Sequence, residues 1–213
     1  MSLEKYIDHT NLKPTATHAD ITKLCKEAIE HGFYAVCVNG CHIPLATEVL
    51  KGSQIKTAAV IGFPLGAMST KAKVFEAMDC IKNGADEIDM VINIGWLKLK
   101  EVDAVRDEIK AIKQAIGSNI LKVIIETCYL SDEEKKLACT LAVDAKADFV
   151  KTSTGFGTGG ATLDDVALMK SVVGNKLKIK ASGGIKTKKE ALQYIELGVS
   201  RIGTSSGPAL IEQ

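Results

Sequence analysis

Eight short apolar segments alternate with segments of helical periodicity along this chain. Such strict alternation predicts parallel strands joined by helical crossovers, and therefore an α/β protein. Eight units within 213 residues predict a closed (β/α)8 TIM barrel that occupies residues 1–213 as a single domain. An open, doubly wound sheet is the alternative, but it ordinarily uses fewer strands for this length. The predicted strands are residues 8–12, 34–38, 56–61, 87–91, 121–126, 149–151, 178–181 and 201–203.

Helix signals separate these strands. Thr17 is a predicted N-cap of the first helix, and Gly32 is its predicted stop. Ser131 precedes three acidic residues and is a predicted N-cap as well. Residues 96–116 carry one uninterrupted helical pattern that ends at Gly117, and they predict a single long helix.

The charge balance argues against several classes of partner. The chain has 27 basic and 26 acidic residues, a net charge of +1, which gives no electrostatic basis for binding nucleic acid or an anionic membrane surface. No apolar run approaches the ~18 residues that span a bilayer. Residues 1–8 include an early acid and lack the apolar core of a signal peptide. We therefore expect a cytoplasmic protein.

The six cysteines agree with that compartment. They fall in helical patterns or in and beside apolar strands, which is typical of small buried side chains and not of a disulfide framework. Cys37, Cys41 and His42 lie close together in the sequence, but no second Cys or His pair has the spacing of a zinc site. We therefore expect no metal.

Residues 149–160 place a lysine, then hydroxyl groups and glycines, at the end of an apolar strand. Burial makes a lysine costly to keep charged, so the amine of Lys151 is a candidate to attack a carbonyl group and form a Schiff base. Glycines such as Gly155 let backbone N–H groups approach a ligand closely. The alternative is a surface lysine followed by an ordinary flexible loop.

In a barrel of this kind, the chemistry lies at the carboxyl ends of the strands. Lys151 and Lys180 end neighbouring strands, and two ammonium groups a few ångströms apart repel, so Lys180 favours loss of a proton from Lys151. Asp89 is a candidate to exchange a proton with Lys180 or with a bound water. Lys122 either joins this interior group or pairs with an acid near the barrel floor. His9 is open to an acid–base role or a structural hydrogen bond.

Two further strand ends predict a phosphate site. Gly183 and Gly184 follow one strand, and Ser205 and Ser206 follow the next, each before a predicted helix. Exposed N–H groups and the helix dipole favour a dianion at such a position. The alternative is a pair of tight turns with serine caps. The glycines within residues 155–159 lack the spacing of a dinucleotide-binding loop.

Several motifs together resemble those of the deoxyribose-phosphate aldolase family, and they extend over nearly the whole chain. They are DHTNLKP at 8–14, VCVN at 36–39, GFPLG at 62–66, GADEIDMV at 84–91, LKVIIET at 121–127, ADFVKTSTG at 147–155 and KASGGIKT at 180–187.

The resemblance implies a class I aldolase without metal or cofactor. Such an enzyme reversibly cleaves 2-deoxy-D-ribose 5-phosphate to acetaldehyde and D-glyceraldehyde 3-phosphate, in deoxyribonucleotide catabolism. Lys151 is then the Schiff-base lysine, Lys180 the lysine that tunes it and relays protons, and Asp89 the acid–base partner. Relatives of this family form dimers or tetramers, so a homo-oligomer is expected. The implied substrate- and phosphate-binding residues are Gly155, Gly183, Gly184, Ser205 and Ser206.

Two features depart from the family pattern. Phe156 stands where some members carry a basic residue, so phosphate binding is expected to rely more on backbone N–H groups. Some members also have a C-terminal tyrosine that assists proton transfer, whereas the last tyrosine here is Tyr194. Water, Asp89 and Lys180 are then expected to carry the proton.

Two other functions stay open as alternatives. One is a phosphosugar isomerase or epimerase on the same barrel, with Asp89 as base and no covalent intermediate. The other is a non-catalytic phosphosugar-binding domain. The combination of Lys151, Lys180 and Asp89 argues against the latter, because binding alone does not require a deprotonated amine.

Overall fold

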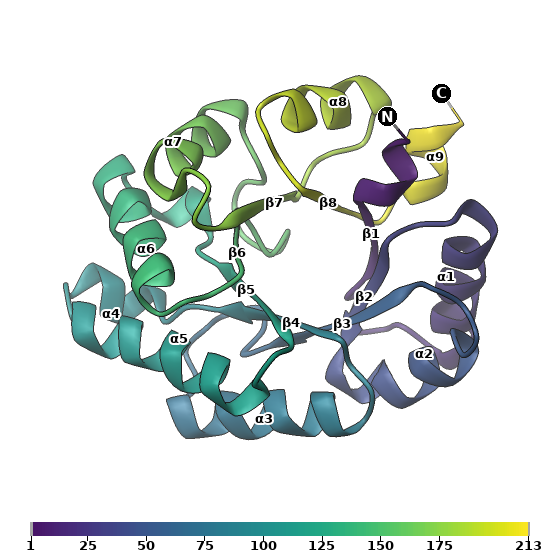
Figure 1. Ribbon diagram of the computed structural model, residues 1–213, viewed down its shortest axis with the longest axis horizontal. Helices are drawn as coiled ribbons and strands as arrows, with labels where there is room; N and C mark the ends of the chain where they lie inside the picture. The colour runs from purple at the N-terminus through teal and green to yellow at the C-terminus, as the bar shows by residue number, and fades with distance from the viewer. Residues whose placement is uncertain (1, 213) are drawn as a thin grey trace.

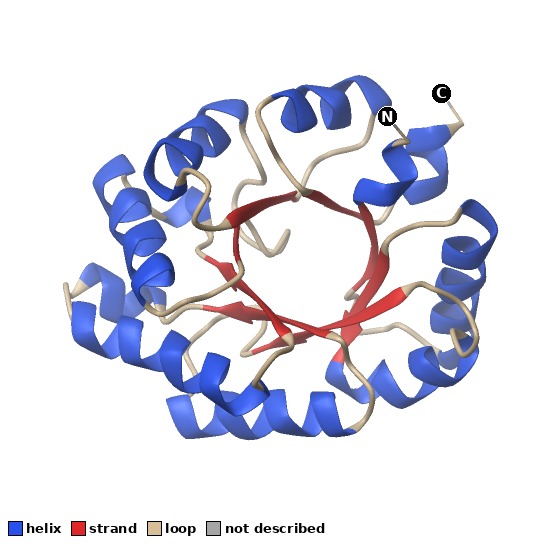
Figure 2. Cartoon of the chain, viewed as in Figure 1, coloured by secondary structure: helices blue, strands red, loops and turns tan. Residues whose placement is uncertain are grey.

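The computed structural model describes residues 2–212 and contains a closed barrel of eight parallel strands in sequence order (Figure 2). This confirms the predicted (β/α)8 barrel. Met1 and Gln213, the first and last residues of the predicted domain, lie outside the described residues. The strands are β1 Ile7–Asn11, β2 Ala35–Asn39, β3 Lys56–Ile61, β4 Glu87–Val91, β5 Ile120–Ile124, β6 Phe149–Lys151, β7 Lys178–Ser182 and β8 Arg201–Thr204.

Helices form an outer layer around the barrel, as Figure 1 shows. Strand β8 pairs with β1 in parallel, and this pairing closes the sheet so that no strand edge is left open. Three short 3-10 helices are η1 Leu3–Tyr6, η2 Gly40–His42 and η3 Thr127–Tyr129. The α-helices are α1 His18–His31, α2 Ile43–Val49, α3 Thr70–Lys82, α4 Ile94–Lys98, α5 Val102–Ile116, α6 Asp132–Asp144, α7 Leu163–Val173, α8 Lys188–Glu196 and α9 Gly207–Ile211.

The predicted helix caps are confirmed. Thr17 and Asp20 form a reciprocal capping box at the start of α1, and Gly32 ends that helix in the left-handed conformation, at φ 65°. Ser131 forms a capping box with Glu134 at the start of α6. These side chains satisfy backbone N–H groups that have no partner within their helices.

The prediction of one long helix over residues 96–116 is wrong. The structure has two helices, α4 and α5, separated by residues 99–101. Lys100 adopts a left-handed conformation at φ 60° and donates its N–H to the Leu97 carbonyl, while the Glu101 N–H bonds to the Trp96 carbonyl. These bonds end α4 in the manner of a helix C-cap. The sequence hides this break because a lysine occupies the position that glycine usually takes.

The barrel separates two environments. Ile88 and Met90 of β4 belong to the large apolar core that also contains residues of the surrounding helices. Glu87 and Asp89 alternate with them and are buried on the other face, inside the barrel. A small apolar cluster, including Cys37, is separate from the large core. The barrel interior therefore holds buried charges as well as apolar side chains.

No helix within residues 2–212 is long and apolar enough to cross a lipid bilayer. All six cysteines are free thiols. Cys25, Cys80 and Cys139 are buried on α1, α3 and α6, as their helical patterns predict. Cys37 is buried on β2, whereas Cys41 is exposed in η2, so the two thiols that raised the question of zinc lie in different environments.

Candidate active site

Lys151 and Lys180 lie side by side in the barrel interior. They are register partners on the neighbouring strands β6 and β7. The Nζ atom of each lysine lies 2.8 Å from the same carboxylate oxygen, Oδ2 of Asp89. Lys151 is 2% exposed, and the other two side chains are fully buried. The structure therefore brings the three predicted catalytic residues into direct contact.

A third lysine contacts the same carboxylate. The Lys122 ammonium donates to Oδ1 of Asp89 at 2.7 Å and also contacts Glu87. Lys122 thus points into the interior and also pairs with acids, which satisfies both descriptions that the sequence left open. Burial opposes ionisation of Asp89, but the three ammonium groups outweigh burial and hold the pKa of this carboxyl well below its ordinary value. Asp89 is therefore a carboxylate at neutral pH.

Lys180 contacts two carboxylates, whereas Lys151 contacts one. Its Nζ atom lies between Oδ2 of Asp89 and Oδ2 of Asp8, at 2.8 and 2.5 Å. Burial favours the neutral amine, but the two carboxylates outweigh burial and raise the pKa of Lys180. Lys180 is therefore an ammonium group, whereas Lys151 contacts a single carboxylate, that of Asp89, which it shares with Lys180.

The loop after β6 is fixed by a carboxylate that sequence analysis did not single out. Glu126 accepts hydrogen bonds from the backbone N–H and the hydroxyl of Thr154. Sequence analysis placed Glu126 at the end of a strand, but β5 ends at Ile124, and Glu126 turns out of the strand at φ 55°. This turn aims its side chain at the loop that follows Lys151. Gly155 comes next in that loop, at φ 85°.

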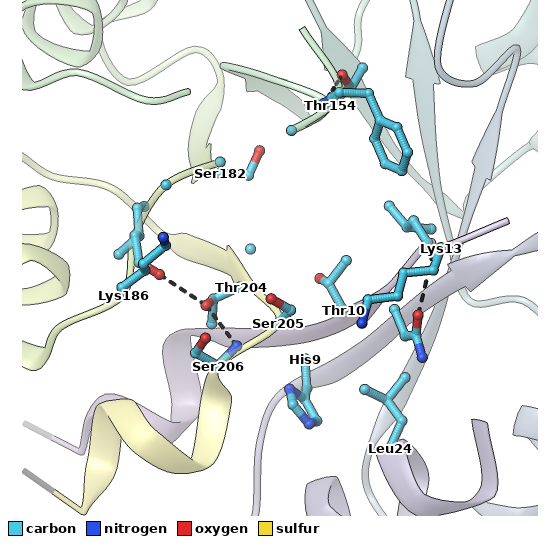
Figure 3. Close-up of a pocket in the computed structure, with 18 of the residues that line it drawn as sticks. His9, Thr10, Lys13, Leu24, Thr154, Ser182, Lys186, Thr204, Ser205 and Ser206 are labelled. Atoms are coloured by element: carbon cyan, nitrogen blue, oxygen red, sulfur yellow. Dashed lines mark hydrogen bonds between the residues drawn. The ribbon is translucent and has the colours of Figure 1, made fainter. Parts of the chain in front are cut away.

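The structure contains a cavity of about 500 Å³, part of whose lining is drawn in Figure 3. Lys151 lines this cavity, and its lining also includes all five predicted substrate- and phosphate-binding residues. These are Gly155, Gly183, Gly184, Ser205 and Ser206.

The turn after β7 presents its backbone to the cavity. Gly183 and Gly184 both have positive φ, at 87° and 82°, a conformation that favours glycine. The carbonyl of Gly183 accepts the Ala161 N–H at 3.0 Å, so the loops after β6 and β7 pack against each other. A Cβ atom on Gly160 would lie 2.2 Å from that carbonyl oxygen. The close approach of these loops therefore requires glycine.

The turn after β8 completes this side of the cavity. The Thr204 hydroxyl donates to the Ile185 carbonyl and accepts the Ser206 N–H, each at 3.0 Å. These bonds, drawn in Figure 3, tie the turns after β7 and β8 together and leave the Ser205 side chain exposed. Polar atoms from two adjacent strand ends thus line one wall of the cavity.

Other residues that line the cavity include both apolar and positively charged side chains. The Phe156 ring packs edge-to-face on Phe63, with 5.3 Å between ring centroids, and forms an apolar section of the rim. Lys13 and Lys186 also line the cavity, and sequence analysis did not single out either. Figure 3 shows them on opposite sides of the opening. Lysines at the cavity add positive charge near the predicted phosphate turns.

His9 makes the structural hydrogen bond that the sequence left open. Its Nε2 atom lies 2.8 Å from Glu27 of α1, and its ring packs edge-on against Phe33. Tyr194 also has a structural partner, because its hydroxyl donates to the Ala161 carbonyl at 2.8 Å.

Three buried ionic residues near the site, Asp8, Glu87 and Arg201, were not predicted from the sequence. A signal was present in the strand periodicity. Glu87 stands two residues before Asp89 on β4, and residues two apart share one face of a strand. Charges at alternate positions of otherwise apolar strands therefore indicate an ionic group inside the barrel.

A family model described as DeoC/LacD family aldolase matches residues 3–209. The chain belongs to this aldolase family. It is therefore a lyase that makes or breaks carbon–carbon bonds, and the resemblance noted in the sequence is confirmed.

Individual relatives agree with that assignment. The deoxyribose-phosphate aldolase of Finegoldia magna is 58% identical over 212 residues, covering 100% of both chains. That of Thermococcus gammatolerans is 58% identical over 217 residues, covering 100% of this chain and 96% of the relative. The solved structure titled as the unique tetrameric structure of deoxyribose phosphate aldolase from Aeropyrum pernix superposes with a TM-score of 0.90 at 32% identity, covering 99% of this chain and 89% of that one. These comparisons favour an aldolase over an isomerase, an epimerase or a non-catalytic binding domain.

Proposed function

We propose that this aldolase reversibly cleaves 2-deoxy-D-ribose 5-phosphate to acetaldehyde and D-glyceraldehyde 3-phosphate through a Schiff base on Lys151. One observation carries the proposal. Lys151 shares Oδ2 of Asp89 with Lys180 at the end of a cavity whose wall contains two polar turns. The names of the relatives at 58% identity support the substrate.

Imine formation begins when the free Lys151 amine attacks the C1 aldehyde carbon of the open-chain sugar. The carbonyl oxygen takes up two protons, one of them from the attacking nitrogen, and leaves as water, so that the C=N bond of a protonated imine replaces the C=O bond. Lys180 is the adjacent ammonium, and Asp89 holds both nitrogens in place. We assign proton transfer to and from the imine to these two residues.

Cleavage then breaks the bond between C2 and C3 of the sugar. The C3 hydroxyl loses its proton, D-glyceraldehyde 3-phosphate leaves, and the bonding electrons form an enamine with the nitrogen of Lys151 as their sink. Protonation of the enamine carbon gives the acetaldehyde imine, and water releases acetaldehyde. Water, Asp89 and Lys180 supply and accept these protons in the proposal.

Substrate orientation follows from the two ends of the cavity. Lys151 fixes the aldehyde end, and the phosphate is assigned to the turns that hold Gly183, Gly184, Ser205 and Ser206. Gly155 is assigned to the loop that contacts the middle of the substrate. Binding energy from the phosphate would then position the reacting carbon near the amine.

We further propose that residues 1–213 form one catalytic domain in a cytoplasmic homo-oligomer, a dimer or tetramer, that serves deoxyribonucleotide catabolism. The substrates are small phosphosugars and aldehydes, and no nucleic acid or membrane partner is proposed. The chemistry assigned to Lys151 uses protein groups and water, so the proposal includes neither metal nor cofactor.

The proposal is tested by incubating the protein with 2-deoxy-D-ribose 5-phosphate and measuring the products. We expect equimolar acetaldehyde and D-glyceraldehyde 3-phosphate, and much slower cleavage of 2-deoxy-D-ribose, which lacks the phosphate. A five-carbon phosphosugar as the product, with no acetaldehyde, would instead indicate an isomerase.

A further inference from the structure

Six buried charged side chains form a closed ring of alternating sign inside the barrel. Each is at most 4% exposed, and each contacts an opposite charge on both sides. They come from β1, β4, β5, β7 and β8, which lie around the barrel in Figure 1. This set is named the buried ring, and its members in order are Asp89, Lys122, Glu87, Arg201, Asp8 and Lys180.

One half of the buried ring connects Asp89 to Arg201. Lys122 Nζ lies 2.7 Å from Asp89 Oδ1 and 2.5 Å from Glu87 Oε2. The Arg201 guanidinium then contacts both oxygens of Glu87, at 3.0 Å from Nη2 and 3.2 Å from Nη1. This bidentate contact fixes the carboxylate of Glu87 in one orientation.

The other half returns from Arg201 to Asp89. Nη1 of Arg201 lies 2.9 Å from Asp8 Oδ1, and Lys180 connects Asp8 to Asp89 through its ammonium nitrogen. The centroid of the Tyr34 ring lies 3.2 Å from the guanidinium carbon of Arg201, so the ring packs against one face of the guanidinium group. Every member therefore has fixed partners.

The buried ring is electrically neutral, because it contains three carboxylates and three cations. Lys151 contacts it through Asp89 alone, so a protonated Lys151 is the surplus positive charge of the group. The Cys37 thiol, 4.0 Å from Asp89 Oδ2, adds no compensating anion, since burial raises its pKa. In a poorly solvated interior, the net charge of the buried ring therefore acts on Lys151 through Asp89.

We propose that Lys122, Glu87 and Arg201 are positioning residues that act through Asp89 to set the pH at which the Lys151 amine reacts. The three are absent from the described residues that line the cavity, so their effect on the reaction is indirect. The inference rests on the proposed function, in which Lys151 forms the imine.

Two substitutions that change the net charge of the buried ring in opposite directions test the inference. Lys122→Met removes a cation, leaves the buried ring with a net negative charge and favours the ammonium form of Lys151. Glu87→Gln removes an anion at nearly constant volume and disfavours that form. The measurement is borohydride trapping of acetaldehyde on Lys151 as a function of pH, quantified by peptide mass spectrometry. We expect the profile to move by about one pH unit, upward for Lys122→Met and downward for Glu87→Gln.

Two further variants separate charge from packing. Lys122→Arg keeps the charge, and its profile should remain near that of the unmodified protein. Lys73→Met is the matched control, because Lys73 is fully buried and lies 2.9 Å from the buried Glu108 on the outer side of the barrel. It should lower stability and leave the profile in place.

Opposite shifts in the two test variants support the inference. If the pH profiles of both variants stay in place, or both move in the same direction, the inference is overturned. The proposed function still stands in that case, provided that Lys151 carries the label. If Lys122→Met does not fold, the nearly isosteric Glu87→Gln still tests the inference. An unshifted pH profile for Glu87→Gln is sufficient to contradict it. Absence of label on Lys151 in the unmodified protein overturns the proposed function and this inference together.

Discussion

Nζ of Lys151 lies 2.8 Å from Oδ2 of Asp89, although 62 residues separate them in the chain. The barrel brings them together because β4 and β6 both direct a charged side chain into the interior. Sequence analysis attributed the reactivity of Lys151 to repulsion by Lys180. The structure adds a carboxylate that contacts both ammonium groups, so the charge balance of the whole group has to be considered.

Replacing Lys151 with leucine is expected to reduce cleavage of 2-deoxy-D-ribose 5-phosphate at least about a thousandfold, because the covalent route is lost. Circular dichroism should show an unchanged fold. The control is Lys178→Leu, since Lys178 is an exposed lysine on β7. Retained turnover in the Lys151 variant would remove this residue from the mechanism.

Substitution of Gly184 by alanine is expected to weaken binding of the phosphorylated substrate. Gly184 has φ 82° with open space at its Cβ position, so alanine introduces backbone strain without a clash. We expect KM to rise about tenfold while trapping of acetaldehyde continues. Gly117→Ala is the matched control, because Gly117 has φ 61° and equal space but lies after α5. Equal KM values in the two variants would contradict the phosphate assignment.

Thr154 to valine is expected to destabilise the loop after β6. The hydroxyl of Thr154 donates to Glu126 and accepts the Phe156 N–H at 3.0 Å, and valine can do neither. Loss of these buried bonds should lower the free energy of unfolding by about 1–3 kcal/mol in urea titrations. Thr140→Val, which removes one exposed hydroxyl bond on α6, should have a smaller effect. Similar losses in both variants would argue against a special role for the loop contact.

Acid should destabilise the protein through the buried carboxylates. Burial opposes ionisation of Asp8, but Lys180 and Arg201 outweigh burial and lower its pKa from 3.8 to about 2. The folded protein then binds fewer protons than the unfolded chain, so Asp8 contributes stability above pH 3.8 that is lost as the pH falls toward 2.

The contribution of Asp8 is on the order of 2 kcal/mol at neutral pH. Urea titrations from pH 6 to pH 3 should show a smaller loss of unfolding free energy in Asp8→Asn than in the unmodified protein. An equal loss in both proteins would mean that this ionic contact adds no acid sensitivity.

The sequence was sufficient to predict the barrel and its helix caps, and to indicate candidate site residues, because their signals are local. Strand periodicity, the cap residues Thr17 and Ser131, and the lysine at the end of β6 are each visible within a few positions. The two-helix arrangement of α4 and α5 was not visible, since the left-handed residue that separates them is Lys100. A left-handed backbone conformation leaves no clear sequence signal when the residue that adopts it is not glycine.

The ionic connections inside the barrel were less predictable. Arg201 and Asp8 are almost 200 positions apart, and their contact depends on closure of the barrel between β8 and β1. The role of Glu126 depends in turn on its departure from β5 at φ 55°. Sequence periodicity indicates which charges face inward, but the register of all eight strands decides which of them meet.

The most direct test of the proposed mechanism is reduction with borohydride in the presence of acetaldehyde, followed by peptide mass spectrometry. We expect a stable ethyl group on Lys151. Label on Lys180 instead would reverse the roles of the two lysines. Folded protein without label on either lysine would contradict a Schiff-base aldolase.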